Sequence, residues 1–286
     1  MSYRILAPSL HATADAARTF LHQQWGVGKK AIKIEESISP DFSYRPTLSA
    51  ETKDCQLMCV ELSESAYSNT IDTFVRDCVN RNLPVRLYIA LPKDIEDQYY
   101  SSKIKKAKEN GVGILEVNGT EGILIQEAIS LSLAKVRPID KQQFPLSYRE
   151  ALASAEHTFR SASPDKGCAI LYDEIEDLCR RIAVKLNDKK LWQSKQKIQF
   201  DYDRGNWASL VELIQRNIDL KRSRCPELKA AFIARIHGIT PYRNESGHKP
   251  RTQAQRMHRD KQLRTRFELA TDILYDLIKN TKKLKP

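Results

Sequence analysis

The sequence predicts a two-domain protein, in which an α/β domain with a mixed sheet precedes an all-α helical bundle. The chain has 286 residues, and 41% of them are hydrophobic, which is enough to build a core in each of two domains. Strand-like and helix-like runs alternate before residue 136, whereas helical patterns dominate after residue 150. The stretch 136–150 contains two prolines and no apolar periodicity. We therefore expect an α/β domain over 1–135, a linker over 136–147 and a helical domain over 148–286.

The elements of the first half follow from the length and spacing of its apolar runs. In chain order we expect a helix at 12–24, a strand at 31–37, a hairpin over 41–62, a helix at 68–81, a strand at 85–91, a helix at 100–110, a strand at 112–118 and a helix at 121–133. An early antiparallel meander followed by alternating strands and helices predicts a mixed sheet flanked by helices.

The second half shows apolar residues at helical spacing and no comparable strands. Its expected helices cover 147–160, 169–188, 206–219, 226–237 and 253–280. The second of these carries apolar residues at 170, 171, 175, 178, 182 and 184, which repeat at roughly 3.6-residue intervals. These segments predict a bundle of four or five helices.

The positive charge of the chain is concentrated in its second half. Residues 1–140 hold 17 Lys and Arg against 18 Asp and Glu, whereas residues 141–286 hold 30 against 18. The last segment, 221–286, alone holds 17 basic and 6 acidic residues. A neutral half joined to a basic half indicates that the basic half binds a polyanion such as nucleic acid. Solvated helix faces are the ordinary alternative explanation for such a cluster.

Several classes of protein are not indicated by this sequence. No run of 18 apolar residues is present, so no transmembrane helix is expected. The first twenty residues lack the apolar stretch of a secretory signal. The six cysteines form no CxxC pair, which argues against a zinc ribbon or a redox motif. We expect reduced thiols, no membrane partner and a cytoplasmic location.

The order of elements over residues 10–133 resembles the PD-(D/E)xK nuclease fold, also called restriction-endonuclease-like. Pro40-Asp41 precedes Glu61-Leu62-Ser63, as the two motifs of that family do. The resemblance implies that Asp41 and Glu61 would hold a Mg²⁺ ion that activates water against a phosphodiester. Ser63 stands where the family has its lysine, and a hydroxyl cannot replace an ammonium beside phosphate. We therefore expect a degenerate nuclease site. The alternatives are a live Mg²⁺ site at Asp41 and Glu61, or ordinary turn and strand-end residues with no metal.

The segment RNESGH places Arg243, Asn244 and His248 between two expected helices. Arginine, a polar residue and a histidine at this spacing resemble the signature of HEPN domains, small helical bundles of which many are metal-independent ribonucleases that work as dimers. The resemblance covers residues 145–282. It implies catalysis by Arg243 and His248 with help from Asn244, or alternatively a non-catalytic HEPN-like bundle. Ordinary turn and capping bonds are a further explanation of the three residues.

The two resemblances together imply a nuclease. We expect a metal-independent endoribonuclease effector of a prokaryotic antiviral-defence or toxin system, which cleaves RNA as a homodimer and needs no cofactor. The nearby basic residues Lys249, Arg251, Arg256 and Arg259 are expected to contact the nucleic acid. A partner protein of the same system is possible. The alternatives are a Mg²⁺-dependent DNA endonuclease acting at Asp41 and Glu61, and a non-catalytic nucleic-acid-binding or assembly protein.

Overall fold

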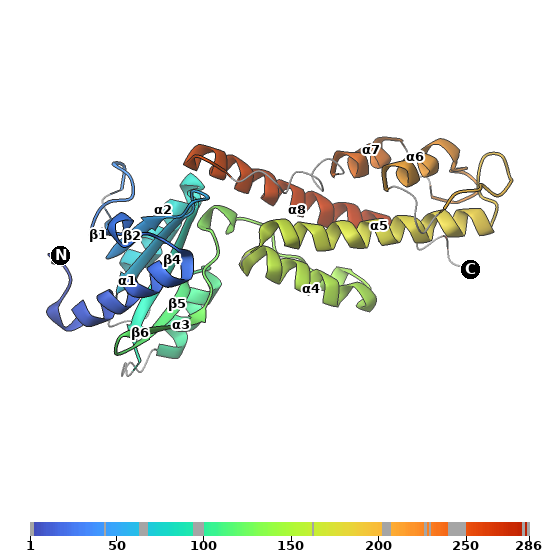
Figure 1. The fold of residues 1–286 in the computed structure, drawn as a ribbon. Helices are drawn as coiled ribbons and strands as arrows, with labels where there is room; N and C mark the ends of the chain where they lie inside the picture. Colours follow the sequence, from blue (N-terminus) through green and yellow to red (C-terminus); the bar gives the residue numbers. More distant parts are fainter. Residues whose placement is uncertain are drawn as a thin grey trace. The chain divides into compact units, whose positions relative to one another are not determined.

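The computed structural model describes residues 3–42, 44–62, 68–93, 100–161, 163–201, 207–225, 228, 230–239, 250–281 and 284. The chain divides into two compact units, each described separately below (Figure 1). Unit 1 comprises Met1–Val136, Arg160–Ala162 and Lys249–Arg264. Unit 2 comprises Arg137–Phe159, Ser163–His248 and Thr265–Pro286.

Unit 1 contains a six-stranded mixed sheet in which the strands lie in sequence order. The strands are β1 (Lys33–Ile34), β2 (Leu48–Glu51), β3 (Leu57–Leu62), β4 (Val85–Pro92), β5 (Gly113–Asn118) and β6 (Glu121–Gln126). The first three form an antiparallel meander, β3, β4 and β5 are parallel, and β6 returns antiparallel to β5. The expected mixed sheet is therefore confirmed.

Helices cover both faces of this sheet. Helix α1 (His11–Trp25) packs on one face, and α2 (Asn69–Arg81) and α3 (Tyr100–Glu109) pack on the other. Strand β3 alternates accordingly, because Met58, Val60 and Leu62 face α1, whereas Leu57 and Cys59 face α2. A strand that is buried on both faces in this way is typical of the centre of a three-layer α/β/α unit.

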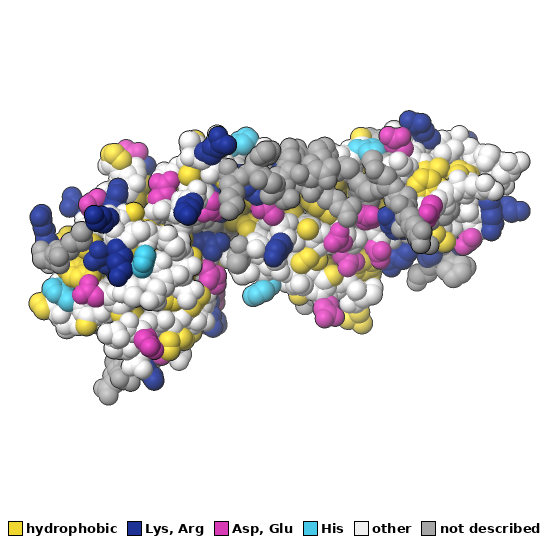
Figure 2. Space-filling view, viewed as in Figure 1, with side chains coloured by type: hydrophobic (Ala, Val, Ile, Leu, Met, Phe, Trp, Pro, Cys, Tyr) yellow, Lys and Arg dark blue, Asp and Glu magenta, His cyan; other side chains and the backbone are white. Residues whose placement is uncertain are grey.

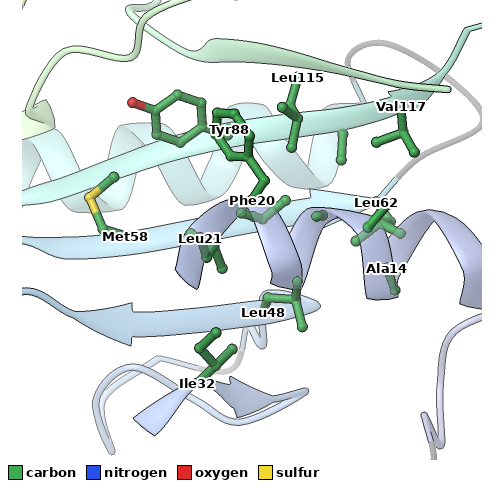
Figure 3. Packing of buried hydrophobic residues seen from close by; sticks show 14 of the residues in the cluster. Ala14, Phe20, Leu21, Ile32, Leu48, Met58, Leu62, Tyr88, Leu115 and Val117 are labelled. Carbon is green, nitrogen blue, oxygen red and sulfur yellow. The ribbon is translucent and has the colours of Figure 1, made fainter. Parts of the chain in front are cut away.

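The core beneath α1 shows how apolar spacing fixes this layer. Ala14, Phe20 and Leu21 of α1 recur at helical spacing and lie against Leu48 of β2 and Tyr88 of β4 (Figure 3). Leu21, Leu48 and Tyr88 are 0% exposed. At roughly 25 cal/mol per Å² of apolar surface, burial of these side chains is the main force holding α1 on the sheet.

The helix expected at 121–133 is wrong, because residues Glu121–Gln126 form strand β6. Strand β5 ends at Asn118, and the two-residue connection to β6 is Gly119-Thr120, in which Gly119 has φ +61°. Glycine is favoured at the first central position of a two-residue hairpin loop, because that position takes a positive φ. The six-residue run EGILIQ is too short for the spacing of its apolar residues to distinguish a strand from a helix. Periodicity alone therefore assigned it to the wrong element.

The start of the sheet is shorter than the sequence predicts. The strand expected at 31–37 is reduced to Lys33–Ile34, and the first strand of the expected hairpin begins only at Leu48. Pro46 lies just before β2 and has no backbone N–H to donate to a ladder. The described residues between β1 and β2, 35–42 and 44–47, form no further strand.

Unit 2 is helical, as expected for the second half of the chain. It contains α4 (Leu146–Ser161), α5 (Pro164–Asp188), α6 (Trp207–Asn217) and α7 (Ala230–Ile239), together with α8 (Gln253–Thr281) from Thr265 onward. Gly167 lies near the start of α5 and packs closely against α4, because an added Cβ there would lie 2.6 Å from Phe159 Cβ. The Phe159 ring in turn lies 4.3 Å from that of Phe267 on α8, which ties the three helices together.

The two units are not two consecutive segments of the chain. Residues Lys249–Arg264, which include the first turns of α8, belong to unit 1 rather than to the helical unit. All six cysteines are free and buried. Among the helices that the structure describes, none is both long and apolar enough to cross a membrane.

Candidate functional site

Asp41 lies at the rim of an open pocket in unit 1. The pocket has a volume of about 790 Å³, and its lining includes Asp41, Phe42, Tyr44, Phe74 and Asp77. The Asp41 side chain is 74% exposed and pairs with Arg81 at the end of α2, at 3.4 Å. Arg81 also lies over the Phe42 ring, 4.8 Å from its centroid. An exposed ion pair of this kind contributes little to stability. Because its side chain is largely exposed, Asp41 is accessible to a ligand.

Glu61 lies near the end of β3, opposite Ile89 of β4, on the face that α2 covers. Its carboxylate accepts hydrogen bonds from the backbone N–H and the hydroxyl of Thr47, at 3.1 and 3.4 Å. Burial raises the pKa of Glu61 above its ordinary value, against the lowering effect of Tyr44 and Thr47. Burial and the nearby Glu61 carboxyl also raise the pKa of Tyr44. Tyr44 Oη makes no hydrogen bond of standard geometry to a described residue.

Asp41 and Glu61 therefore have separate partners and different environments. Asp41 faces the open pocket, whereas Glu61 is enclosed by Thr47 and Tyr44. Ser63 lies outside the described residues. Within the described part of the chain, no three His, Cys, Asp or Glu side chains are arranged to hold a metal ion. Among the described residues, Asp41 pairs with Arg81 and Glu61 accepts from Thr47, so the two carboxylates share no partner.

Arg243, Asn244, His248 and Lys249 lie outside the described residues. The helices on either side of them are described: α7 ends at Ile239 and α8 begins at Gln253. Within unit 2, Arg235 of α7 pairs with Asp276 of α8 at 3.0 Å. The candidate RNESGH segment therefore connects two observed helices, as expected from the sequence.

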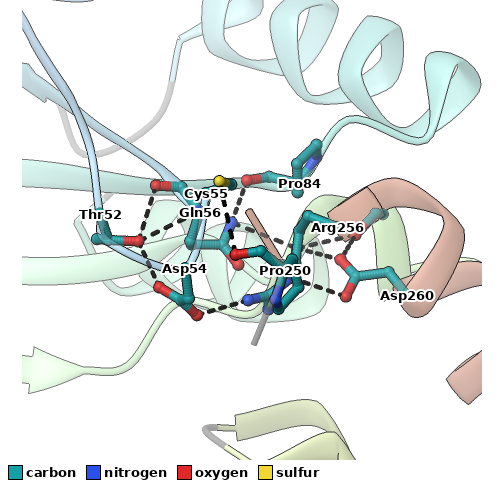
Figure 4. Close-up of polar contacts among 10 residues, drawn as sticks. Thr52, Asp54, Cys55, Gln56, Pro84, Pro250, Arg256 and Asp260 are labelled. Atoms are coloured by element: carbon teal, nitrogen blue, oxygen red, sulfur yellow. Dashed lines mark hydrogen bonds and ion pairs between the residues drawn. The ribbon is translucent and has the colours of Figure 1, made fainter. Parts of the chain in front are cut away.

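Arg256 forms ion pairs within unit 1, although the sequence led us to expect that it contacts nucleic acid. Its guanidinium donates to Asp54 Oδ2 at 2.7 Å and to Asp260 Oδ1 at 2.9 Å (Figure 4). The Arg256 side chain is 11% exposed and that of Asp260 is 1% exposed. Two carboxylates already occupy this guanidinium, so it is not free to bind phosphate. Burial raises the pKa of Asp54, but the hydrogen bond from Thr52 and the charge of Arg256 outweigh burial and hold the pKa below its ordinary value.

The same buried network continues to the chain that follows β6. Asp260 Oδ2 accepts hydrogen bonds from the hydroxyls of Ser130 and Ser132. Gln56 donates to the Pro84 carbonyl (Figure 4). It also donates to the Ser130 hydroxyl at 3.5 Å. These bonds satisfy a carboxylate that would otherwise be costly to bury. The first turns of α8 are thereby fixed to unit 1 by ionic and hydroxyl contacts.

The other expected nucleic-acid contacts differ from one another. The Arg251 side chain is exposed, and its backbone N–H donates to Gln255 at 2.8 Å. Arg259 is half-buried and takes part in further interactions. Of the basic residues proposed for this segment, Arg251 is therefore the described one that is most accessible to phosphate.

A second pocket, in unit 2, was not predicted from the sequence. It has a volume of about 550 Å³, and its lining includes Phe144, Tyr148, Arg181 and Lys185. Arg181 donates to the Tyr148 hydroxyl at 2.9 Å and lies 5.6 Å from the centre of its ring. The signal available in the sequence was the spacing of Arg181 and Lys185, four residues apart on one face of α5.

Comparisons with protein families, with curated proteins and with solved structures each find no match to this chain.

Proposed function

We propose that the protein is a metal-independent endoribonuclease whose reaction is carried by Arg243 and His248. The observation that supports this proposal is the position of RNESGH between α7 and α8, two helices in the expected order. The excess of basic residues over 221–286 supports a polyanionic substrate.

We further propose that the two units belong to the families they resemble. In unit 1 the order α1, β1, β2, β3, α2, β4 supports a restriction-endonuclease-like fold. In unit 2 the succession of α4 to α8 supports a HEPN-like bundle. In this proposal unit 1 senses, binds or dimerises, and unit 2 carries the chemistry. A role as an effector in a prokaryotic defence or toxin system is part of the same proposal.

The chemistry of the two residues suits RNA. The 2′-hydroxyl of RNA is the nucleophile, so cleavage needs a base for its proton, an acid for the 5′-oxygen and a cation beside the phosphate. Histidine is the side chain whose ordinary pKa lies closest to neutral pH, so the imidazole of His248 can perform either proton transfer. Arg243 keeps its charge and can bind two phosphoryl oxygens at once. Asn244 can hydrogen-bond the phosphate.

One chain supplies only one such pair, whereas the reaction needs both a base and an acid. A two-fold symmetric dimer could bring two Arg243/His248 pairs into one cleft. The proposed active form is therefore a homodimer, and dilution below its dissociation constant should lower the specific activity.

Incubation with labelled tRNA, mRNA and plasmid DNA, each with and without EDTA, tests the proposal. RNA alone should be cut, EDTA should have no effect, and the product should carry a 2′,3′-cyclic phosphate. His248→Ala should slow cleavage by about 10²–10⁴-fold. Arg243→Ala should also abolish most activity, and Arg243→Lys should restore it only in part. Cleavage that survives His248→Ala, or that acts equally on DNA, contradicts the proposal.

A second candidate function is a Mg²⁺-dependent DNA endonuclease acting at Asp41 and Glu61. It is favoured by the sheet order of unit 1 and by the open pocket beside Asp41. The separate partners of the two carboxylates weigh against it. Asp41→Ala and Glu61→Ala should leave nuclease activity nearly intact. If either abolishes cleavage, and cleavage needs Mg²⁺ or Mn²⁺, this candidate replaces the first.

A further inference from the structure

One end of unit 2 carries a dense cluster of positive charge that lies outside the RNESGH segment. Two segments of chain, 189–198 and 219–224, hold seven Lys and Arg and one acidic residue, Asp219. Dark-blue side chains are visible at this end of the bundle, beyond the end of α5 (Figure 2). We call Lys190, Lys195, Lys221 and Arg224 the basic platform.

The two segments are joined, so the platform is a single surface. Trp192 and Ile218 form an antiparallel bridge, and the Gln193 N–H donates to the Asn217 carbonyl at 2.7 Å. Arg222 crosses between the segments and donates to the Lys190 carbonyl at 2.7 Å. Trp192 is 0% exposed and anchors the first segment in the core. Such a fixed backbone presents its side chains at low entropic cost to a ligand.

The four positively charged side chains of the basic platform are accessible to an anionic ligand. All four side chains are exposed, and none has a hydrogen bond or ion pair among the residues that the structure describes. By contrast, Lys197 pairs with Asp188, and Arg222 pairs with Asp219. Unpaired cations held close together repel one another, so their grouping favours an anionic partner.

The backbone provides a second, independent observation. Lys190, Lys195 and Arg224 have φ values of +51°, +56° and +55°. A residue with a Cβ is strained in this left-handed region, and glycine or asparagine is the usual occupant. Nothing in the backbone therefore selects a long basic side chain at these three positions. Residues that are held in an unfavourable conformation by a rigid framework are a recognised indication of a functional site.

We propose that the basic platform binds the phosphodiester backbone of RNA, and does so without reading its sequence. This inference rests on the proposed function, because it assigns a docking surface for the same substrate. A membrane surface is the less favourable partner, because membrane binding also needs exposed apolar side chains. The described large apolar residues that are exposed are Ile5, Ile123, Leu124, Ile125, Leu146 and Val184, and none lies in 189–198 or 219–224.

The test measures binding of the full chain to a fluorescent 2′-O-methyl RNA, which the proposed reaction cannot cleave. The platform variant is Lys190→Asn, Lys195→Asn and Arg224→Asn together, because asparagine tolerates positive φ. The matched control is Lys29→Asn, Lys30→Asn and Lys53→Asn, which removes the same charge from exposed positions of unit 1. A charge-retaining variant, Lys190→Arg, Lys195→Arg and Arg224→Lys, separates charge from structure.

The platform variant should bind RNA about 10-fold or more weakly at about 0.1 M salt. The slope of log affinity against log salt should become shallower by about 2, since each lost phosphate contact removes about 0.7 for a single strand. The control and the charge-retaining variant should bind like the wild-type protein. A DNA of the same sequence should show a similar loss, because the phosphodiester is shared.

Three results would overturn the inference: unchanged RNA binding in the platform variant, an equal loss in the control, or a loss of binding to phosphatidylserine vesicles with RNA binding intact. Failure here is distinguishable from failure of the proposed function. Cleavage of ordinary RNA by wild-type protein and its loss in His248→Ala would still support the reaction, even if the platform has no role.

Discussion

Arg256 and Asp54 lie about two hundred residues apart in the sequence, yet Arg256 Nη1 lies 2.7 Å from Asp54 Oδ2. The contact joins the start of α8 to the turn between β2 and β3, within unit 1. The same guanidinium also pairs with the buried carboxylate of Asp260.

Arg256→Met should lower the free energy of unfolding by about 3–5 kcal/mol, because it leaves Asp260 buried without a counter-charge. Urea denaturation of the full chain measures the change. The control Arg251→Met alters an exposed arginine five residues earlier and should change stability by less than about 0.5 kcal/mol. The double variant Arg256→Met and Asp260→Leu should recover most of the loss. A loss below about 1 kcal/mol for Arg256→Met would show that the ion network is dispensable.

A fragment of residues 1–136 should be less stable than the same unit in the full chain, because it lacks Lys249–Arg264. Ser130 and Ser132 lose their bonds to Asp260, and the turn at Asp54 loses Arg256. A synthetic peptide of residues 249–266 should bind the fragment and raise its melting temperature. The same peptide with Arg256→Met is the control and should not do so. A fragment that is fully stable alone and indifferent to the peptide contradicts this prediction.

The helices of both units were predictable because their apolar residues repeat at 3.6-residue intervals over two or more turns. The buried positions of α5, including Leu171, Ile175, Leu178 and Ile182, follow that spacing closely. The strand at 121–126 was not predictable from periodicity, because a six-residue apolar run fits either element. Gly119, at the first central position of the hairpin turn, was the local signal that decides the case.

The candidate sites were less predictable, because they depend on contacts between distant segments. Charge alone assigned Arg256 to phosphate, whereas its partner Asp54 comes from a turn in the first quarter of the chain. Only the Arg256–Asp260 spacing of four residues gave a local indication of an ion pair. The basic platform could not be predicted for a different reason. The positive φ values at Lys190 and Lys195 cannot be inferred from the sequence, because lysine rarely adopts them.

Glu61→Gln should remove part of the pH dependence of stability. Burial raises the folded-state pKa of Glu61 above its ordinary value of 4.5. A group with a raised folded pKa stabilises the protein fully below its unfolded pKa, and that contribution is lost as the pH rises through the folded pKa. Relative to wild type, Glu61→Gln should therefore gain stability at about pH 7.5 compared with about pH 4.

Urea denaturation at the two pH values measures this effect, and Glu121→Gln, which alters an exposed carboxyl on β6, is the control. An unchanged pH dependence in Glu61→Gln contradicts the prediction. The same variant also separates the two candidate nuclease sites. If Mg²⁺ raises the melting temperature of the wild-type protein and not of Glu61→Gln, Glu61 is a metal ligand and the DNA endonuclease gains support.

Lys190→Gly should stabilise the protein, although it removes a side chain. Lys190 follows the end of α5 with φ +51°, and the Leu191 N–H donates to the Leu186 carbonyl at 2.8 Å, as in a Schellman motif. Relief of the left-handed strain is worth about 1–2 kcal/mol, and the added freedom of glycine in the unfolded chain offsets about 0.4–1 kcal/mol. The free energy of unfolding should rise by about 0.5–1 kcal/mol, whereas Lys189→Gly, at φ −86°, should lower it by a similar amount. Equal destabilisation by both changes would show that the Lys190 side chain stabilises the fold. Its basic identity would then need no RNA partner to explain it.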